Sequence, residues 1–320
     1  MTVARSDHTS SVLNDGKVLM IGGYVNSAEL YDPLTSMWIP TGNMTSVRYI
    51  FPSTRLNNGQ VLVSGGPDNS AELYDPLTGT WATTGNMTVA RCRHTASLLA
   101  TGKVLVTGGD ATGCSGTSMN SAELYDPSTG IWTSTGSMNY ARYQHIATVL
   151  TNGKVLVTAG SPPNNAEIYD PSTGIWTVTG ASSDQLYLHA ATLLDNGKVL
   201  ISGGRNGGTY YNTAELYDPL TGNWTRTGNM NTGRYEHVLT VLPNGKVLVT
   251  GGMNGATYLN TAELYDPSTE IWTTTENMNT PRSFHTACVL SNGEVLASGG
   301  WTTGVTPTNS AEVYYFAETY

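Results

Sequence analysis

Short apolar runs alternate with turn residues along the whole chain, and they recur in a fixed order. In the fourth copy, an alternating segment at 145–150 is followed by a Val-Leu-Val run at 154–158. Ala-Glu-Ile-Tyr fills 166–169, an Asp-Pro-Ser-Thr-Gly stretch follows at 170–174, and Trp176 begins a further segment. β-Branched and aromatic residues fill these runs, and turn residues separate them. The pattern predicts four short strands per copy, here called strands a to d.

The connections between these segments have the sequences of tight turns. Asn152-Gly153 joins the first two segments, and an Asn-Gly pair strongly favours a hairpin because a type I′ turn needs positive φ at both central positions. Asp-Pro-Ser-Thr-Gly joins the last two segments. No stretch has the periodicity of an amphipathic helix. We therefore expect an all-β protein.

The whole pattern occurs seven times. An Ala-Glu pair marks the third strand of each copy and recurs at intervals of 43 to 51 residues: Glu29, Glu72, Glu123, Glu167, Glu215, Glu263 and Glu312. Such intervals are typical of propeller blades. We expect one domain over residues 1–320, with blades covering approximately residues 5–47, 48–90, 91–141, 142–185, 186–233, 234–281 and 282–320.

The repeated phrases also resemble those of a known family. Arg-x-x-His before strand a, Gly-Gly after strand b, Glu-x-Tyr-Asp-Pro in strand c and the tryptophan of strand d together resemble the kelch motif, over essentially the whole chain. The resemblance implies a seven-bladed kelch-type β-propeller. Each blade of such a propeller has four antiparallel strands, and the blades surround a central channel.

Three places depart from the repeat. Phe51 stands where other copies have histidine, and Leu186 stands where they have arginine. The last copy stops before its tryptophan is due, so we expect an incomplete last blade of three strands, completed by sequence beyond either end. Residues 1–5 are identical to residues 87–91, and we therefore expect the chain to start inside a repeat.

The composition argues against two classes of partner. A net charge of −9 and a pI near 5.0 disfavour nucleic acid, which needs a basic surface. No apolar run approaches the roughly 18 residues that suggest a membrane-spanning helix. We expect a monomeric domain of a larger chain. Its location stays open, and the extracellular space is one option.

The three cysteines are too few for a disulfide framework. Cys92 and Cys114 belong to the same copy and are candidates for one disulfide at one end of it. Cys288 lies in an apolar segment, where we expect a buried free thiol.

The strand directions define two faces of the propeller. Because the strands of a blade are antiparallel, the d–a and b–c loops lie on one face, here called the loop face. The a–b and c–d turns lie on the other, here called the turn face. The turns are nearly uniform, whereas the b–c loops vary from residues 22–27 in the first copy to 109–120 in the third. Repeat proteins place such variation on a binding face, so we expect ligands at the loop face.

Two groups of side chains on the loop face are candidates for ligand contact. The first is repeated near the expected channel: Arg5, Arg48, Arg91, Arg142, Arg234 and Arg282, followed in four copies by Tyr49, Tyr143, Tyr187 and Tyr235. The second comes from the variable b–c loops: Tyr210, Tyr211, Tyr258 and Trp301. Guanidinium groups bind carboxylates through paired hydrogen bonds, and aromatic rings stack on rings or sugars.

The repeated arginines have two interpretations. In kelch propellers that bind acidic peptides, arginines from this part of the repeat contact the ligand, and the resemblance implies that role here. Alternatively, each arginine is a structural strut paired with the repeated glutamate.

The six histidines occupy one position of the repeat: His8, His94, His145, His189, His237 and His285. A ring of imidazoles suggests a metal site. However, equivalent positions of a propeller are too far apart to share one ion at bonds of roughly 2 Å. We therefore expect structural histidines, and we predict no metal, no cofactor and no catalytic residue.

Two functions follow from these patterns. The first is a non-catalytic binding or scaffold module that recognises a protein segment or a glycan on the loop face, because a stiff ring presents its tyrosine and tryptophan side chains at low entropic cost. The second, implied by the resemblance, is a kelch-type metalloenzyme with a site at the channel mouth, similar to copper-radical galactose oxidases, sialic-acid epimerases or iron-using plant specifier proteins. The copper enzymes need a cysteine–tyrosine crosslink and further histidine ligands. Here all six histidines occupy the repeated position.

Overall fold

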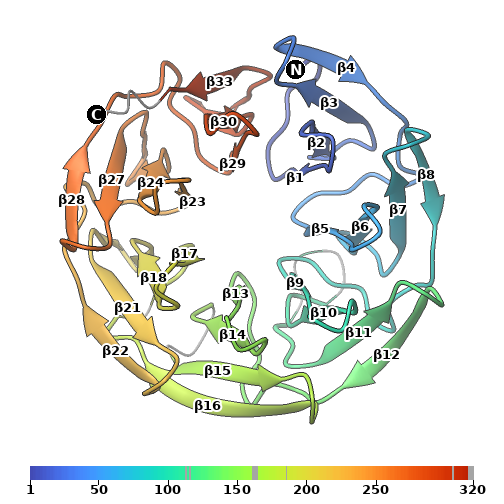
Figure 1. Ribbon diagram of the computed structural model, residues 1–320, viewed down its shortest axis with the longest axis horizontal. Helices are drawn as coiled ribbons and strands as arrows, with labels where there is room; N and C mark the ends of the chain where they lie inside the picture. The colour runs from blue at the N-terminus through green and yellow to red at the C-terminus, as the bar shows by residue number, and fades with distance from the viewer. Residues whose placement is uncertain (112–113, 115–116, 161–164, 185, 305, 316–320) are drawn as a thin grey trace.

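The computed structural model is a ring of seven antiparallel β-sheets around a central axis (Figure 1). It describes the chain except for residues 112–113, 115–116, 161–164, 185, 305 and 316–320. Six sheets contain four strands in the order a-b-c-d, and the last contains three. The predicted seven-bladed, all-β propeller with an incomplete last blade is therefore confirmed. Within the described residues, no helix has the length and apolar character needed to cross a membrane.

Each strand position recurs in chain order from blade one to blade seven. The a strands are β1 (Thr9–Val12), β5 (Ser53–Arg55), β9 (Thr95–Leu98), β13 (Ile146–Val149), β17 (Ala190–Leu193), β23 (Val238–Val241) and β29 (Thr286–Val289). The b strands are β2 (Val18–Ile21), β6 (Val61–Ser64), β10 (Val104–Thr107), β14 (Val155–Thr158), β18 (Val199–Ser202), β24 (Val247–Thr250) and β30 (Val295–Ser298).

The outer strands follow the same order. The c strands are β3 (Ala28–Asp32), β7 (Ala71–Asp75), β11 (Ala122–Asp126), β15 (Asn165–Asp170), β21 (Ala214–Asp218), β27 (Ala262–Asp266) and β33 (Ala311–Tyr314). The d strands are β4 (Met37–Pro40), β8 (Thr80–Thr83), β12 (Ile131–Thr135), β16 (Ile175–Ala181), β22 (Asn223–Arg226) and β28 (Ile271–Thr274).

Within the described residues, three b–c loops contain short hairpins of their own on the loop face. They are β19–β20 (Arg205–Asn206 and Thr209–Tyr210), β25–β26 (Met253–Asn254 and Thr257–Tyr258) and β31–β32 (Trp301–Thr302 and Thr306–Pro307).

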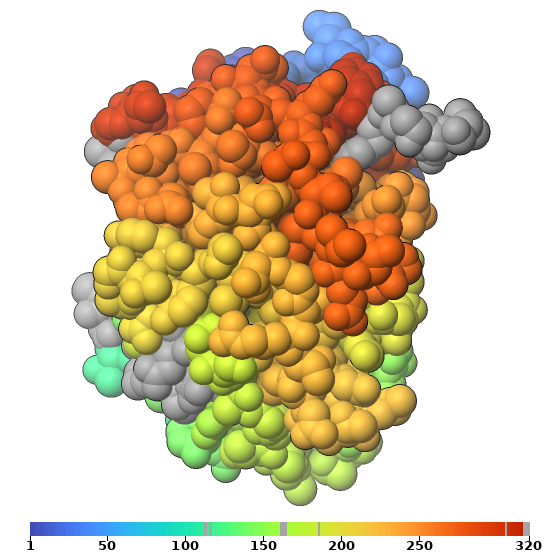
Figure 2. Space-filling view, turned by 90° about the vertical axis from the view of Figure 1, so that its left-hand side faces the viewer, coloured from blue at the N-terminus to red at the C-terminus, as the bar shows by residue number. Residues whose placement is uncertain are grey.

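The burial of each strand follows from its place in the blade. Strand b is buried at all four positions in every blade, because neighbouring blades cover both of its faces, and its sequence is correspondingly a continuous apolar run. Strand d lies at the rim and is mostly exposed apart from its tryptophan. On the side of the molecule seen in Figure 2, the orange, yellow and green segments of successive blades lie against one another.

Neighbouring a strands contact each other around the channel, and β1 contacts both β5 and β29, which closes the ring (Figure 1). The rim is also tied from blade to blade. Trp132 Nε1 donates a hydrogen bond to the carbonyl of Gly85 in the preceding blade at 2.7 Å, and the hydroxyls of Tyr125 and Thr84 lie 2.8 Å apart. These contacts explain why the tryptophan and tyrosine belong to the repeat.

The Gly-Gly pair marks the place where the next blade packs against the end of strand b. Gly251 has φ of +59°, and a Cβ there would lie 2.9 Å from His285 Cε1 and even closer to the carbonyl oxygen of Arg282. Close packing and positive φ therefore favour glycine at this position, although blade four has Ala159 there with φ of 50°.

Candidate functional site

One residue of each blade lies at the channel mouth on the loop face. It is the third residue of the Arg-x-x-His phrase, and the seven form what we call the mouth ring: Asp7, Ile50, Arg93, Gln144, Leu188, Glu236 and Phe284. All seven have φ between 50° and 58°, a left-handed conformation that is uncommon outside glycine. The repeated twist turns each side chain out of the blade and toward the axis.

Backbone hydrogen bonds link neighbouring members of the mouth ring. The Ile50 amide donates to the Asp7 carbonyl at 3.0 Å, and the Arg93 amide donates to the Ile50 carbonyl at 3.0 Å. The Glu236 amide donates to the Leu188 carbonyl at 3.0 Å in the same way. The ring is thus held by its main chain, and its side chains remain available to a ligand.

All seven members of the mouth ring line a pocket of 440 Å³, a volume within the usual range of ligand sites. Tyr24 and Trp301 from the b–c loops complete its rim, and His94, His145 and His189 lie deeper. Its walls therefore combine two carboxyl groups, one guanidinium, one amide and several apolar or aromatic side chains.

The two carboxyl groups of the pocket are poorly solvated. The pKa of Glu236 is raised to about 8, chiefly by burial and in smaller part by the charge of Asp7, while Arg205 and the Ser283 hydroxyl oppose the shift. Burial also raises the pKa of Asp7, although Trp301 donates a hydrogen bond to its Oδ2 at 3.2 Å and Arg93 stabilises its charge. Perturbed carboxyl groups inside a cleft are typical of functional sites.

Arg93 stabilises the charge of Asp7 and also has close partners of its own. Its Nη1 lies 2.7 Å from Asp110 Oδ2 and 2.6 Å from the carbonyl oxygen of Cys114. Cys92 and Cys114, the predicted pair, form a disulfide with their Cα atoms 5.2 Å apart, which ties this b–c loop to the start of blade three.

The six repeated arginines lie inside the blades, with no exposed surface. Arg234 is representative: it donates to the carbonyls of Gly251 at 2.8 Å and Thr261 at 3.1 Å, and its Nη2 lies 2.8 Å from Glu263 Oε1. The others pair equivalently: Arg5 with Glu29, Arg48 with Glu72, Arg91 with Glu123, Arg142 with Glu167 and Arg282 with Glu312. The geometry favours the strut interpretation and places none of these arginines at the surface.

The tyrosines that follow the arginines have varied positions. Tyr49 stacks on Tyr24 with ring centroids 4.4 Å apart, and Tyr235 stacks on Tyr210 at 5.4 Å. The guanidinium of Arg205 lies 5.0 Å from the ring of Tyr235. These contacts form two aromatic groups on the loop face, one on each side of blade seven.

The remaining aromatic candidates lie outside the pocket lining. They are half-buried: Tyr143, Tyr187, Tyr211 and Tyr258. Of the aromatic residues that the sequence suggested for ligand contact, Trp301 is the one that lines the pocket in the described part of the chain.

The six histidines make contacts between blades. His285 Nε2 lies 3.0 Å from the Thr250 hydroxyl at the end of the preceding strand b, and His237 Nε2 lies 3.1 Å from that of Ser202. Burial lowers the pKa of His8, His145 and His285 to about 3, so these side chains are neutral at neutral pH. In blade two the pair is apolar instead: Phe51 packs in one cluster with Ile21, which ends the preceding strand b.

The comparison with family models decides the identity. A model described as the KLHDC2/KLHL20/DRC7 Kelch-repeats domain matches residues 94–300, and a Kelch motif model matches residues 5–45. The chain belongs to the kelch-repeat family. No curated protein sequence matches it.

Solved structures share the kelch propeller fold. A fungal alcohol oxidase of the AA5 family, in complex with copper, is 21% identical over 95% of this chain and 73% of its own, with a TM-score of 0.79. The protein YjhT is 16% identical over 84% of this chain and 95% of its own, with a TM-score of 0.67. At these identities the likeness concerns the fold alone.

The described residues do not fit a copper centre of this kind. Nε2 of the imidazoles contacts serine and threonine hydroxyls between blades, and Cys92 and Cys114 are joined to each other. Burial raises the pKa of the Cys288 thiol to about 12, far from the thiolate that a metal needs. In the described part of the chain, no three His, Cys, Asp or Glu side chains are grouped to hold a metal ion.

The mouth ring was missed by the interpretation of the sequence, which treated the third residue of Arg-x-x-His as unspecified. A signal was nevertheless present. This position varies in charge, size and polarity between otherwise similar phrases, as Asp7, Arg93 and Phe284 show. Variation inside a repeated motif marks the residues that the fold leaves free.

Proposed function

We propose that this kelch propeller is a non-catalytic binding module that recognises a protein segment or a glycan on its loop face. One observation carries the proposal: the seven unrepeated residues of the mouth ring converge on one pocket, while the repeated arginines pair with glutamates inside the blades. The stacked pair Tyr24–Tyr49 and the indole of Trp301 add aromatic surface beside that pocket. Aromatic side chains of this kind dominate the energetics of binding sites.

The binding proposal predicts a face-specific loss of affinity. Ligands found on peptide and glycan arrays should bind Trp301→Ala about tenfold or more weakly, because aromatic anchors in a pocket contribute about 2 kcal/mol or more. Affinity is measured by calorimetry. Leu77→Ala is the control, since Leu77 is 96% exposed in a c–d turn on the opposite face. Equal affinities of the two variants, or no binder on either array, would contradict the proposal.

The metalloenzyme alternative makes a separate prediction. If the buried histidines and cysteines are structural, as their contacts indicate, we expect well below one copper or iron per protein after expression with either metal. Elemental analysis of the purified protein measures this ratio. A near-stoichiometric metal content that survives dialysis would overturn the binding-module proposal in favour of the enzyme.

A further inference from the structure

Three consecutive members of the mouth ring form an arc of two carboxyl groups with an aromatic ring between them. Glu236 of blade six, Phe284 of blade seven and Asp7 of blade one follow one another around the channel and line the same pocket. The Phe284 amide donates to the Glu236 carbonyl at 3.4 Å, which fixes their order. An aromatic ring between two carboxyl groups is the arrangement that suits an organic cation, which binds carboxylates at its edge and an aromatic ring at its face.

The Glu236 carboxyl interacts with the Ser283 hydroxyl, but one of its oxygens lacks a hydrogen-bond partner. Its Oε2 atom is buried, and no described residue donates to it. A buried carboxyl oxygen without a donor costs free energy, which a ligand that supplies N–H groups would recover. Asp7 accepts a hydrogen bond at Oδ2 from Trp301, whose indole also lines the pocket.

The arginines near this arc act on its carboxyl groups, and both also have other partners. Arg93 is bound to Asp110 and to the Cys114 carbonyl. Arg205 stacks over Tyr235, and its side chain is exposed, so water screens its charge. The deeper histidines are neutral, because burial lowers the pKa of His145 to about 3 and that of His189 to about 4.

We infer that the channel-mouth pocket binds the guanidinium or ammonium group of an arginine or lysine side chain, presented by an extended protein segment and seated on Phe284 between Asp7 and Glu236. This inference rests on the proposed binding function and gives it a ligand class. The inferred ligand is positively charged, whereas the repeated arginines suggested an acidic ligand. The net charge of −9 favours encounter with a basic segment.

Binding of such a cation depends on pH in a defined direction. The pKa of Glu236 is about 8, so its carboxyl is mostly neutral near pH 6 and ionised near pH 9. Asp7, Arg205, Arg93 and the Tyr235 hydroxyl are the other ionisable groups that act on this part of the pocket. The affinity for a basic segment should therefore rise as the pH passes through about 8, with release of one proton on binding below it.

The test uses libraries of N-acetylated, C-amidated pentapeptides that carry arginine, lysine, citrulline, glutamine or glutamate at the central position. Citrulline keeps the shape of arginine without its charge. Bound peptides are measured by mass spectrometry, and enriched sequences are titrated by fluorescence anisotropy. Agmatine, a free guanidinium compound, tests whether the cation alone is sufficient.

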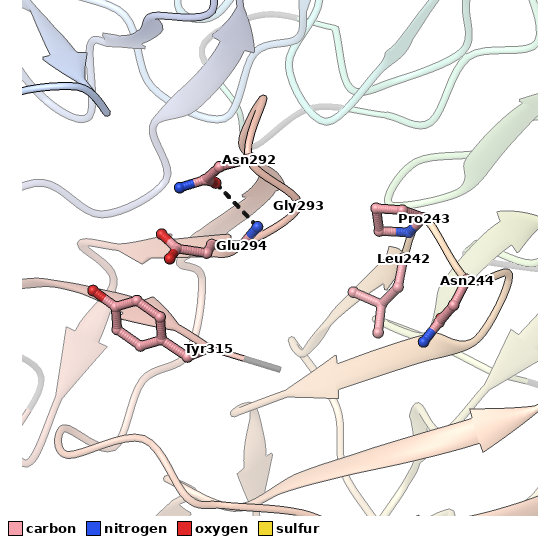
Figure 3. Close-up of a pocket in the computed structure, with 7 residues that line it drawn as sticks. All are labelled: Leu242, Pro243, Asn244, Asn292, Gly293, Glu294 and Tyr315. Atoms are coloured by element: carbon pink, nitrogen blue, oxygen red, sulfur yellow. Dashed lines mark hydrogen bonds between the residues drawn. The ribbon is translucent and has the colours of Figure 1, made fainter. Parts of the chain in front are cut away.

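The variants are chosen to keep the fold. Glu236→Gln and Asp7→Asn remove charge at constant shape. Glu294→Gln is the matched control: Glu294 lies in a separate pocket of 320 Å³ on the turn face, between the a–b turns of blades six and seven (Figure 3). There its amide donates to Asn292 Oδ1 at 3.1 Å, a bond that the substitution leaves intact.

We expect the arginine and lysine libraries to be retained about tenfold more than the citrulline and glutamine libraries, the difference that one charge-assisted hydrogen bond makes. Glu236→Gln should remove this preference and its pH dependence, and Glu294→Gln should keep both. Equal retention of citrulline, preference for glutamate, or agmatine binding as tightly as the peptide would each overturn the inference. Retention of peptides without charge preference, or binding of glycans only on the arrays, would overturn the inference but leave the proposed binding module standing. If neither peptides nor glycans bind, both the inference and the proposed binding function are overturned.

Discussion

Arg234→Leu is expected to lower the free energy of unfolding by about 3–5 kcal/mol, because removing one partner of a buried ion pair leaves the other charge buried and unpaired. Arg234 has no exposed surface, and Glu263 is 1% exposed. The variant also deprives the carbonyls of Gly251 and Thr261 of their donor. Guanidinium chloride unfolding, followed by tryptophan fluorescence, measures the change.

An exposed ion pair provides the matched control. Arg226 Nη2 lies 3.0 Å from Asp184 Oδ2, and the Arg226 side chain is 50% exposed. Arg226→Leu should therefore cost only about 0–1 kcal/mol. Equal losses in the two variants would contradict the strut. A loss of ligand affinity by Arg234→Leu with unchanged stability would favour direct ligand contact instead.

Blade five allows the reverse experiment, because Leu186 occupies the arginine position there. Its glutamate, Glu215, is 2% exposed and accepts hydrogen bonds from the amide of Ser183 alone among the described residues. Leu186→Arg should raise the free energy of unfolding by about 1–2 kcal/mol, the usual contribution of hydrogen bonds to a charged group. A decrease would mean that the packing of Leu186 against Ala159 and Ile201 is worth more.

Stability should fall steeply in acid because of the buried histidines. The pKa of His8, His145 and His285 is lowered from 6.5 to about 3, so the unfolded chain binds protons at a higher pH than the folded one. The stabilisation is complete above about pH 6.5 and is lost as the pH falls toward 3. By linkage, one such histidine costs on the order of 2 kcal/mol at pH 5. Denaturant unfolding at a series of pH values measures the slope.

One double variant isolates a single histidine from this effect. Thr250→Ile with His285→Phe recreates between blades six and seven the apolar pair that Ile21 and Phe51 form between blades one and two. Because the double variant has one titrating histidine fewer, its free energy of unfolding should depend less steeply on pH. His285→Phe alone should cost about 1–3 kcal/mol more, because the Thr250 hydroxyl stays buried without its partner. An unchanged slope in the double variant would show that His285 does not contribute.

The strands could be predicted closely because local chemistry determines them and seven copies repeat the information. The predicted b segment of blade four, 154–158, contains β14 (Val155–Thr158), and the predicted c segment, 166–169, lies within β15 (Asn165–Asp170). Continuous apolar runs and Asn-Gly turns specify these elements without knowledge of the partner blade. The incomplete last blade could be predicted in the same way, because the last copy of the repeat stops before its tryptophan.

The site could be predicted only in part, because it depends on packing between distant blades. The variable loops indicated the loop face, and Trp301 lines the pocket there. The repeated arginines looked available because sequence shows charge but not burial. Asp7 and Glu236 lie far apart in the chain, and their left-handed backbone is not marked by glycine in the sequence. Closure of the ring brings them together.

The backbone geometry of the mouth ring has an evolutionary consequence. Because main-chain hydrogen bonds hold the ring and its side chains line the pocket, each blade contributes one residue that takes no part in the buried arginine–glutamate struts. Seven such positions can change one at a time, limited chiefly by the cost of positive φ for a branched side chain such as that of Ile50. A single scaffold can thus acquire a new specificity by point substitution, without any insertion and without losing stability elsewhere.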